Sequence, residues 1–143
     1  LETQGVAVGG YGTSEFPAFW SRASGLSAPL RLDEPEQVAR FWKTRMALNQ
    51  RGGMLLANPV PRENEIPAWE MKEHIAQALS EAAAQGVVGK EVTPWLLSRI
   101  FELTSGRSLS TNIALVKNNA VVAAKVAAAL ADMRDILQTS ISD

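Results

Sequence analysis

The most constraining feature of this sequence is an uninterrupted apolar run at residues 54–57 (Met-Leu-Leu-Ala), enclosed between Gly52-Gly53 and Asn58-Pro59. A strand exposed on one face alternates apolar and polar residues, whereas a strand covered on both faces is apolar throughout. The run is too short for a helix, and the flanking pairs are turn signals. The sequence therefore predicts an interior strand whose sheet carries helices on both faces.

Two further segments predict strands of the same sheet. Residues 6–8, followed by Tyr11, form a short apolar run between glycines, as a buried strand does. Residues 30–32 alternate apolar and basic side chains and predict a short edge strand. Between these segments, residues 12–25 contain glycine, proline, serine and three aromatic residues, a composition typical of a loop.

Start and stop signals predict four helices. Thr93-Pro94 is a cap followed by a first-turn proline, and Gly86 stands where a helix ends. Asp33, with Glu36 three residues later, indicates a capping box. The last helix is rich in alanine, so we expect it to approach its neighbours closely and to be buried on more than one side. The expected helices run from Asp33 to Gly52, from Pro67 to Gly86, from Thr93 to Ser105, and from Ser110 or Thr111 to about Leu137.

Alternation of strands and helices predicts an α/β fold, with a mixed sheet flanked by helices and a helical carboxy-terminal third. A chain of 143 residues is long enough for one domain and too short for two. Its first five residues, Leu-Glu-Thr-Gln-Gly, resemble the last turn of a helix that ends on a glycine, and no initiator methionine precedes them. We therefore expect residues 1–143 to be the carboxy-terminal half of a larger single domain.

Composition excludes several classes of protein. A net charge of −1 argues against a nucleic-acid binder that depends on phosphate contacts. The absence of cysteine excludes disulfides, thiolate nucleophiles and zinc–thiolate sites, and a single histidine excludes a multi-histidine metal cage. The most apolar run, residues 120–131, is interrupted by Lys125 and is too short to cross a bilayer. We therefore expect a soluble, cytoplasmic protein with no membrane and no nucleic acid as partner.

Polar residues in the last helix are the first candidates for a functional site. Asn112 and Asn119 are seven residues apart and share a helix face. A buried amide must be hydrogen-bonded, so the same asparagines are equally consistent with helix caps or ties to nearby loops. Asn112 has an additional claim, because we expect it in the first helical turn, where free backbone N–H groups favour an anion.

The loop after the first strand is the second candidate. Thr13 and Arg22 are hydrogen-bond donors that follow a buried strand, and α/β proteins bind ligands beyond the carboxyl ends of their strands. Asn58 ends the apolar run and invites the same interpretation, although Asn-Pro is also a turn signal. An ordinary surface loop explains these residues too. His74 lies among glutamates in a predicted helix and indicates only a solvated side chain.

Six segments together carry a family pattern. They are residues 1–6, residues 10–22 with Pro17-Ala18-Phe19, residues 52–59, residues 89–94, residues 102–104, and residues 112–120. In this order, over nearly the whole chain, they resemble the pseudouridine-5′-phosphate glycosidase family, also called the indigoidine synthase A-like family.

This resemblance implies a lyase that reversibly cleaves the carbon–carbon glycosidic bond of pseudouridine 5′-phosphate, giving uracil and ribose 5-phosphate. It implies a lysine that forms a Schiff base with the ring-opened sugar, a glutamate proton donor, and Mn²⁺ held near an aspartate through water. Carbon is a poor leaving group, and an iminium accepts the electrons of the broken bond. The resemblance further implies a phosphorylated sugar or nucleotide substrate and a homotrimer.

The family's lysine, glutamate and metal-site aspartate lie upstream of the segment that matches Leu1. Of the family's proposed active-site residues, only an asparagine maps onto this chain, at Asn112. We therefore expect the missing amino-terminal half to be a partner of this chain, no metal ligand within the chain, and no activity of the chain alone. None of its lysines stands in the family's context: Lys43, Lys72, Lys90, Lys117 and Lys125.

Two alternatives remain open at this point. A relative with the same fold could act as a C-glycosynthase that joins ribose 5-phosphate to an aromatic acceptor. A non-catalytic binding module could also keep the fold. The sequence does not decide between cleavage and synthesis, and it does not identify the acceptor base.

Overall fold

The computed structural model describes residues 2–50 and 52–139, which fall into two compact units. Within the described residues, the first unit comprises residues 2–16, 25–50, 52–58 and 117–139. The second unit comprises residues 17–24 and 59–116. Each unit therefore gathers segments that are far apart in the sequence.

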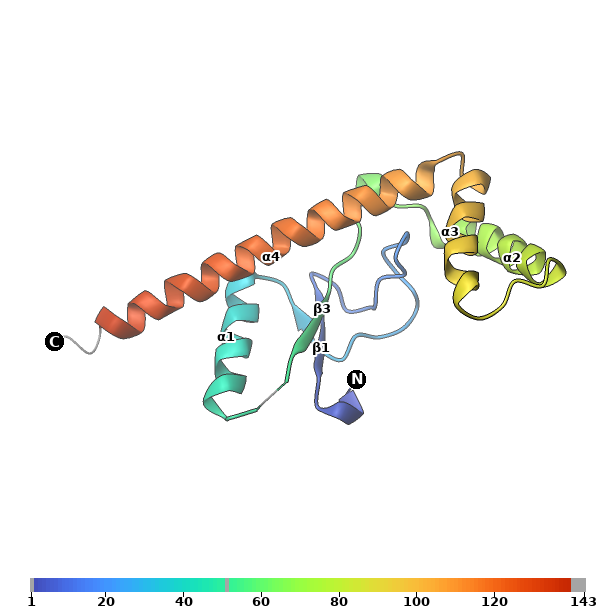
Figure 1. Ribbon diagram of the computed structural model, residues 1–143. Coiled ribbons are helices and arrows are strands. Elements are labelled where there is room, and N and C mark those ends of the chain that lie inside the picture. The colour runs from blue at the N-terminus through green and yellow to red at the C-terminus, as the bar shows by residue number, and fades with distance from the viewer. Residues whose placement is uncertain (1, 51, 140–143) are drawn as a thin grey trace. The chain divides into compact units, whose positions relative to one another are not determined.

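The sheet of the first unit has three strands, β1 (Ala7–Tyr11), β2 (Arg31–Leu32) and β3 (Met54–Ala57), in the order β2-β1-β3 (Figure 1). We expected a mixed sheet, but these described strands are all parallel. The helix between β2 and β3 carries the chain back to the same end of the sheet, which makes β3 parallel. β3 pairs with β1 from Ala7↔Met54 to Gly10↔Ala57.

β3 does not take the expected interior position among the described strands of this chain. Among the described strands β1 is central and β3 lies at one edge, because the connection from β2 passes across β1. Leu55 of β3 has 43% of its surface exposed, although its composition is that of a strand covered on both faces.

Close backbone packing explains the glycines of β1. A Cβ at Gly10 would lie 2.5 Å from the carbonyl oxygen of Thr13, and one at Gly9 would lie 3.3 Å from that of Leu30. Gly10 also donates its N–H to the Leu30 carbonyl at 2.7 Å. The loop after β1 therefore folds back directly onto the strand, which only glycine permits.

Helix α1 (Pro35–Ala47) begins and ends differently from the expectation. Its N-cap is Glu34, because Pro35 is the first helical residue. The Gln37 side chain accepts from the backbone N–H of Asp33 at 2.7 Å and of Glu34 at 3.1 Å, so it takes the place expected for Glu36. The helix ends at Ala47, before the expected Gly52. Asn49, just beyond the helix, has a left-handed φ of 55°.

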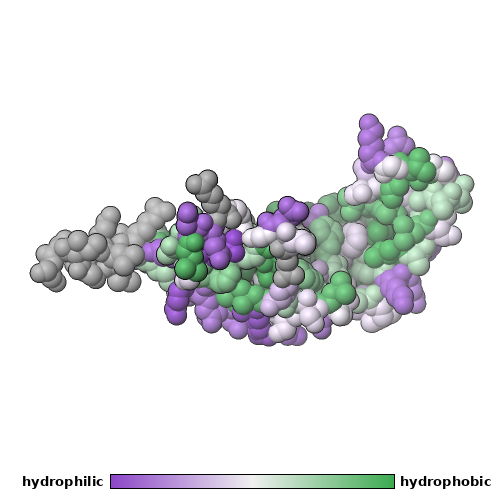
Figure 2. Space-filling view, turned by 90° about the horizontal axis from the view of Figure 1, so that it is seen from below, coloured by the Kyte–Doolittle hydropathy of each residue, from purple (hydrophilic) through white to green (hydrophobic). Residues whose placement is uncertain are grey.

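The second unit holds a helical pair, α2 (Ala68–Ala84) and α3 (Val92–Leu103), which pack against each other. Its core contains Ile66, Met71, Ala78 and Ile100, each at most 3% exposed. Apolar side chains also lie at the surface of this pair, at the right of the view in Figure 2. The remaining short elements are the 3₁₀ turns η1 (Glu2–Gln4), η2 (Arg62–Asn64) and η3 (Gly89–Glu91).

The last helix, α4 (Arg107–Thr139), starts earlier than the expected Ser110 or Thr111. Gly106, with a φ of 83°, separates it from α3. Residues 107–116 belong to the second unit and the later ones to the first. The expectation that α4 is buried on more than one side is wrong here, since most of its described residues are exposed or half-buried.

By length and mean hydropathy, residues Arg107–Met133 of α4 could cross a membrane, which the shorter run 120–131 did not suggest. Only 17% of the most apolar window is buried. A core helix of an α/β domain satisfies the same criterion, so length and hydropathy do not assign α4 to a membrane.

Candidate functional site

Asn112 lies in a pocket of the second unit with a volume of about 260 Å³. Its walls are mostly aromatic and aliphatic, and Asn112 and Ser108 are its polar side chains. The lining residues are Phe19, Trp20, Leu97, Phe101, Ser108, Leu109 and Asn112. Such a cavity, apolar with a few polar groups, is the usual form of a small-molecule site.

A tight turn holds two aromatic residues of this pocket. Phe19 has a φ of 63°, a left-handed conformation that is unfavourable for a bulky side chain. Its ring meets that of Trp20 edge-on, with centroids 4.7 Å apart. The Trp20 Nε1 donates to the Ser108 carbonyl at 3.2 Å, which ties the turn to the start of α4. Backbone strain of this kind is typical of functional sites.

Asn112 does not lie where the sequence placed it. Because α4 begins at Arg107, Asn112 is in the second helical turn, and its backbone N–H is used within the helix. The argument that free N–H groups at this residue favour an anion is therefore wrong. Its half-buried side-chain amide makes no hydrogen bond to any residue in the described part of the chain. The amide is available to a ligand in the pocket.

Arg22 ties the turn to the segment before α2. Its Nη1 donates to the Val60 carbonyl, and its backbone N–H donates to Glu65 Oε1 at 2.7 Å. Ser21, which is buried, donates its hydroxyl to the Ile66 carbonyl at 2.7 Å. Arg22 does not line the Asn112 pocket, and its role in substrate binding stays a prediction.

Thr13 belongs to the first unit and closes a local turn. Its Oγ1 accepts from the Glu15 N–H at 3.1 Å and donates to the Glu15 carbonyl at 3.2 Å. Glu15 in turn accepts from the Gly25 N–H at 3.0 Å. These bonds shape the loop after β1 and leave the substrate-binding prediction for Thr13 untested.

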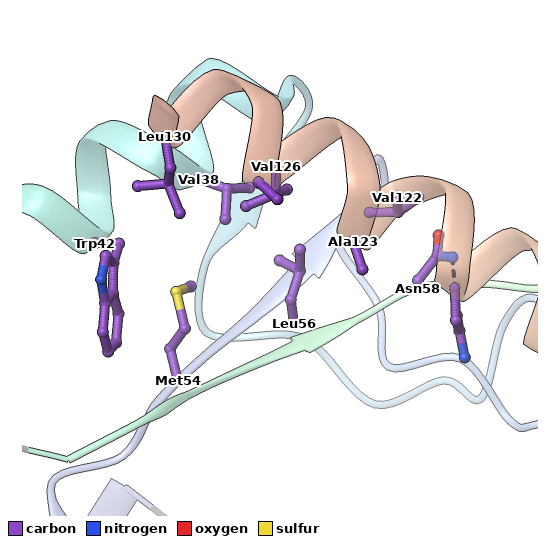
Figure 3. Close-up of a pocket in the computed structure, with 11 residues that line it drawn as sticks. Val38, Trp42, Met54, Leu56, Asn58, Val122, Ala123, Val126 and Leu130 are labelled. Atoms are coloured by element: carbon purple, nitrogen blue, oxygen red, sulfur yellow. Dashed lines mark hydrogen bonds between the residues drawn. The ribbon is translucent and has the colours of Figure 1, made fainter. Parts of the chain in front are cut away.

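Asn58 lies at one end of a second pocket, within the first unit, with a volume of about 500 Å³. Its Nδ2 donates to Asn119 Oδ1 at 3.0 Å, so the helix face that carries Asn119 binds the end of β3 (Figure 3). The rest of the lining is apolar and comes from α1, β3 and α4: Val38, Trp42, Met54, Leu56, Val122, Ala123, Val126, Ala127 and Leu130.

Tyr11 marks a third position, at the carboxyl end of the central strand β1, where α/β proteins bind ligands. Partial burial raises the pKa of its phenol, and the nearby carboxylates of Glu34, Glu36 and Asp33 raise it further. Tyr11 therefore keeps its proton at neutral pH and remains a hydrogen-bond donor. Among the described residues, no group of three or more His, Cys, Asp or Glu side chains could hold a metal ion.

The aromatic walls of the Asn112 pocket were missed as site residues. From the sequence, Phe19 and Trp20 were expected only as loop residues, and Phe101 only as part of a helix. Their meeting depends on contacts between residues 88 positions apart, such as Trp20 with Ser108. The Pro17-Ala18-Phe19 segment of the family pattern was the available signal.

The parallel sheet with its helices places the chain in the α/β class. The family described as indigoidine synthase A like protein matches residues 1–129, and the chain belongs to this family. A pseudouridine-5′-phosphate glycosidase of Methylobacterium nodulans is 61% identical over 94% of this chain and 40% of that protein. One of Solibacter usitatus is 58% identical over 89% of this chain and 42% of that protein.

Two solved structures share the fold. The prealnumycin C-glycosynthase AlnA, in complex with ribulose 5-phosphate, aligns with a TM-score of 0.86 and 29% identity over 94% of this chain and 44% of that chain. An indigoidine synthase A-like protein of Thermotoga maritima aligns with a TM-score of 0.75 and 37% identity over 89% and 41%. The chain thus spans less than half the length of these relatives.

Proposed function

We propose that this chain supplies part of the active site of a pseudouridine-5′-phosphate glycosidase, which reversibly cleaves pseudouridine 5′-phosphate to uracil and ribose 5-phosphate. One observation carries the proposal: an asparagine amide without an internal partner lines an aromatic pocket, in a chain 61% identical to a protein of that name. The remaining activity would depend on residues outside this chain.

The pocket suits a planar base. Uracil presents an N–H group between two carbonyl groups, and an asparagine amide offers both a donor and an acceptor to such an edge. Phe19, Trp20 and Phe101 supply apolar walls for the ring. Asn112 would bind and orient the base without transferring a proton, because an amide does not titrate usefully.

The Schiff-base lysine, the acid glutamate and the Mn²⁺ site belong, by the family resemblance, to a portion upstream of this chain. The described residues offer no metal-binding cluster, so we assign Mn²⁺ no ligand and no step here. A homotrimer in the cytoplasm is part of the same proposal. Borohydride treatment of the chain alone with ribose 5-phosphate should give no adduct. Lys43, whose Nζ is buried without a hydrogen-bond partner, is the lysine to examine first.

A C-glycosynthase is the second candidate, favoured by the alignment with AlnA at a TM-score of 0.86. The higher identity, 61% to a glycosidase against 29% to AlnA, supports the glycosidase as the first candidate. Incubating the complete enzyme with ribose 5-phosphate and either uracil or a polycyclic aromatic acceptor distinguishes them. Pseudouridine 5′-phosphate as the product supports our proposal, and a C-glycoside of the aromatic acceptor alone contradicts it.

Substitution of Asn112 tests the site itself. In the complete enzyme, Asn112→Ala should lower kcat/KM by about 10²-fold, the scale of one oriented donor. Asn112→Asp should be no better, because it adds a charge beside a phosphorylated substrate. Ser110→Ala is the control, since Ser110 is exposed on the same helix and its hydroxyl donates to the Arg107 carbonyl at 2.8 Å, within the helix itself. Unchanged kinetics for Asn112→Ala in a folded enzyme would remove Asn112 from the site.

A further inference from the structure

Ser108 brings a second polar side chain to the Asn112 pocket. The residue is only 4% exposed, and it lines the pocket of about 260 Å³ together with Asn112. Its hydroxyl makes no hydrogen bond to any residue in the described part of the chain. Three other buried hydroxyls of this unit, those of Ser21, Thr104 and Thr111, each donate to a backbone carbonyl. Because hydroxyls of buried residues are usually hydrogen-bonded, the open one at Ser108 requires an explanation.

The backbone of Ser108 is held at both of its polar groups. Its N–H donates to Thr104 Oγ1 at 3.1 Å, and its carbonyl accepts from Trp20 Nε1 at 3.2 Å. Within helix α4 the same carbonyl accepts from the N–H four residues later, which is that of Asn112. A carbonyl oxygen has two lone pairs and can accept both bonds. The position of Ser108 is therefore fixed, while its hydroxyl stays available to a ligand.

Ser108 and Asn112 present their side chains to the same space. They are four residues apart in α4, so their side chains share one helix face, about 6 Å apart along the axis. The amide of Asn112 offers one donor group and one acceptor, and a hydroxyl can add a further donor. Uracil has two carbonyl groups on either side of an N–H group. When the amide binds the N–H and one carbonyl, the second carbonyl still needs a donor.

We infer that Ser108 is a further specificity-determining residue of this site, whose hydroxyl donates a hydrogen bond to a carbonyl of the base that Asn112 orients. The inference rests on the proposed function, because it takes uracil as the base. A site built to hydrogen-bond a polar ring edge rejects rings that lack this edge, since its own polar groups are then left unpaired. Ser108 thus helps the pocket to select a pyrimidine over an apolar ring of similar size.

Stability separates this role from a structural one. Alanine has a higher helix propensity than serine, and a hydroxyl without an internal partner adds nothing to the folded state. Ser108→Ala should therefore leave the Tm of the complete enzyme unchanged or slightly raised. A hydroxyl that holds the fold together would give the opposite result, a lower Tm. Groups that serve a ligand are commonly retained at some cost in stability.

Binding of uracil to the complete enzyme, measured by isothermal titration calorimetry, is the main test. Ser108→Ala should weaken uracil binding by about three- to tenfold, the scale of one neutral hydrogen bond. The KM for ribose 5-phosphate in the synthetic direction should not change, because the contact is to the base. Ser110→Ala is the matched control and should leave both quantities unaltered, since Ser110 is exposed and its hydroxyl bonds within the helix.

Two analogues locate the contact. Pyrimidin-2-one and pyrimidin-4-one each lack one of the two carbonyl groups of uracil. Ser108→Ala should weaken the binding of one analogue and have no effect on the other, the one without the carbonyl that Ser108 contacts. Equal weakening of uracil and both analogues would overturn the inference, because no single carbonyl would then receive the hydrogen bond.

Two further results would also overturn it. They are unchanged uracil binding by the Ser108→Ala enzyme, and weaker binding accompanied by a fall in Tm. Asn112→Ala, measured in the same way, separates this inference from the proposed function. If Asn112→Ala weakens uracil binding and Ser108→Ala does not, the proposed function stands and this inference fails. If the unsubstituted complete enzyme does not bind uracil, both fail.

Discussion

The two units of the chain differ in how completely they are packed. The second unit surrounds a closed core, in which Ile66 and Ile100 are at most 2% exposed. In the first unit, α1, β3 and α4 enclose a pocket of about 500 Å³, and β3 has an open edge. The first unit also buries Val38 and Ala39, but its helices and β3 leave a wider pocket than the one at Asn112 in the second unit.

Buried polar groups show the same difference. In the second unit, the buried hydroxyls of Ser21, Thr104 and Thr111 each donate to a backbone carbonyl at 2.7 Å. In the first unit, Lys43 Nζ and Arg45 Nε are buried without a partner among the described residues. An unpaired buried polar group costs about 1–3 kcal/mol. The first unit therefore buries polar atoms that its described residues leave without hydrogen bonds.

The largest expected loss of stability comes from a substitution in the closed core of the second unit. Ile100→Ala should lower the free energy of unfolding by about 2–5 kcal/mol, because it leaves a cavity among packed side chains. Leu56→Ala should cost less than half as much, since Leu56 already borders an open pocket. Urea unfolding followed by tryptophan fluorescence measures both. Equal losses would remove the distinction between the units.

A smaller loss of stability is expected from a substitution in the first unit. Gly10→Ala should cost about 1–3 kcal/mol, because the new methyl group would meet the Thr13 carbonyl oxygen at 2.5 Å. Gly53→Ala is the control, since a Cβ there meets nothing within 4 Å. A neutral Gly10→Ala, judged by thermal unfolding, would show that the loop after β1 is loosely held.

The smallest effect concerns an ion pair of the second unit. Hydrogen bonds from Arg99 and Gln77 lower the pKa of Glu81, so its ionised form is favoured by folding. This contribution is present above the ordinary glutamate pKa and is lost as pH falls through the lower pKa of the folded state. Glu81→Gln should therefore lower the Tm slightly at pH 7, with the difference from the unsubstituted chain disappearing in acid. A difference that persists at pH 2 would contradict this assignment.

Much of the fold followed from local patterns. The runs at residues 6–8, 30–32 and 54–57 correspond to β1, β2 and β3, and Gly86 ends α2 with a left-handed φ of 68°. Strand order did not follow, because it depends on which strand the α1 connection crosses. The start of α4 was also misplaced, because Gly106 turns the chain sharply and the Thr104 hydroxyl, upstream of the expected caps, accepts from the Ser108 N–H at 3.1 Å.

The candidate site was only partly predictable. Asn112 was identified through the family pattern, whereas its aromatic pocket arises from a strained turn at Phe19 and a hydrogen bond from Trp20 to Ser108. Neither has a local sequence signature. Arg22 was expected at a ligand because arginine binds phosphate; its guanidinium donates to the Val60 carbonyl, and its role at a ligand stays a prediction. Long-range contacts of this kind decide what a polar residue does.

Hydrogen–deuterium exchange of the unmodified chain tests the central claim most directly. The claim is that the core of the second unit around Ile100 is packed more closely than the sheet of the first unit at β3. We expect the amides of β3, residues 54–57, to exchange at least about a hundredfold faster than those at the centre of α3, near Ile100. Equal protection of β3 and α3 in a monomeric, cooperatively folding chain would contradict the account.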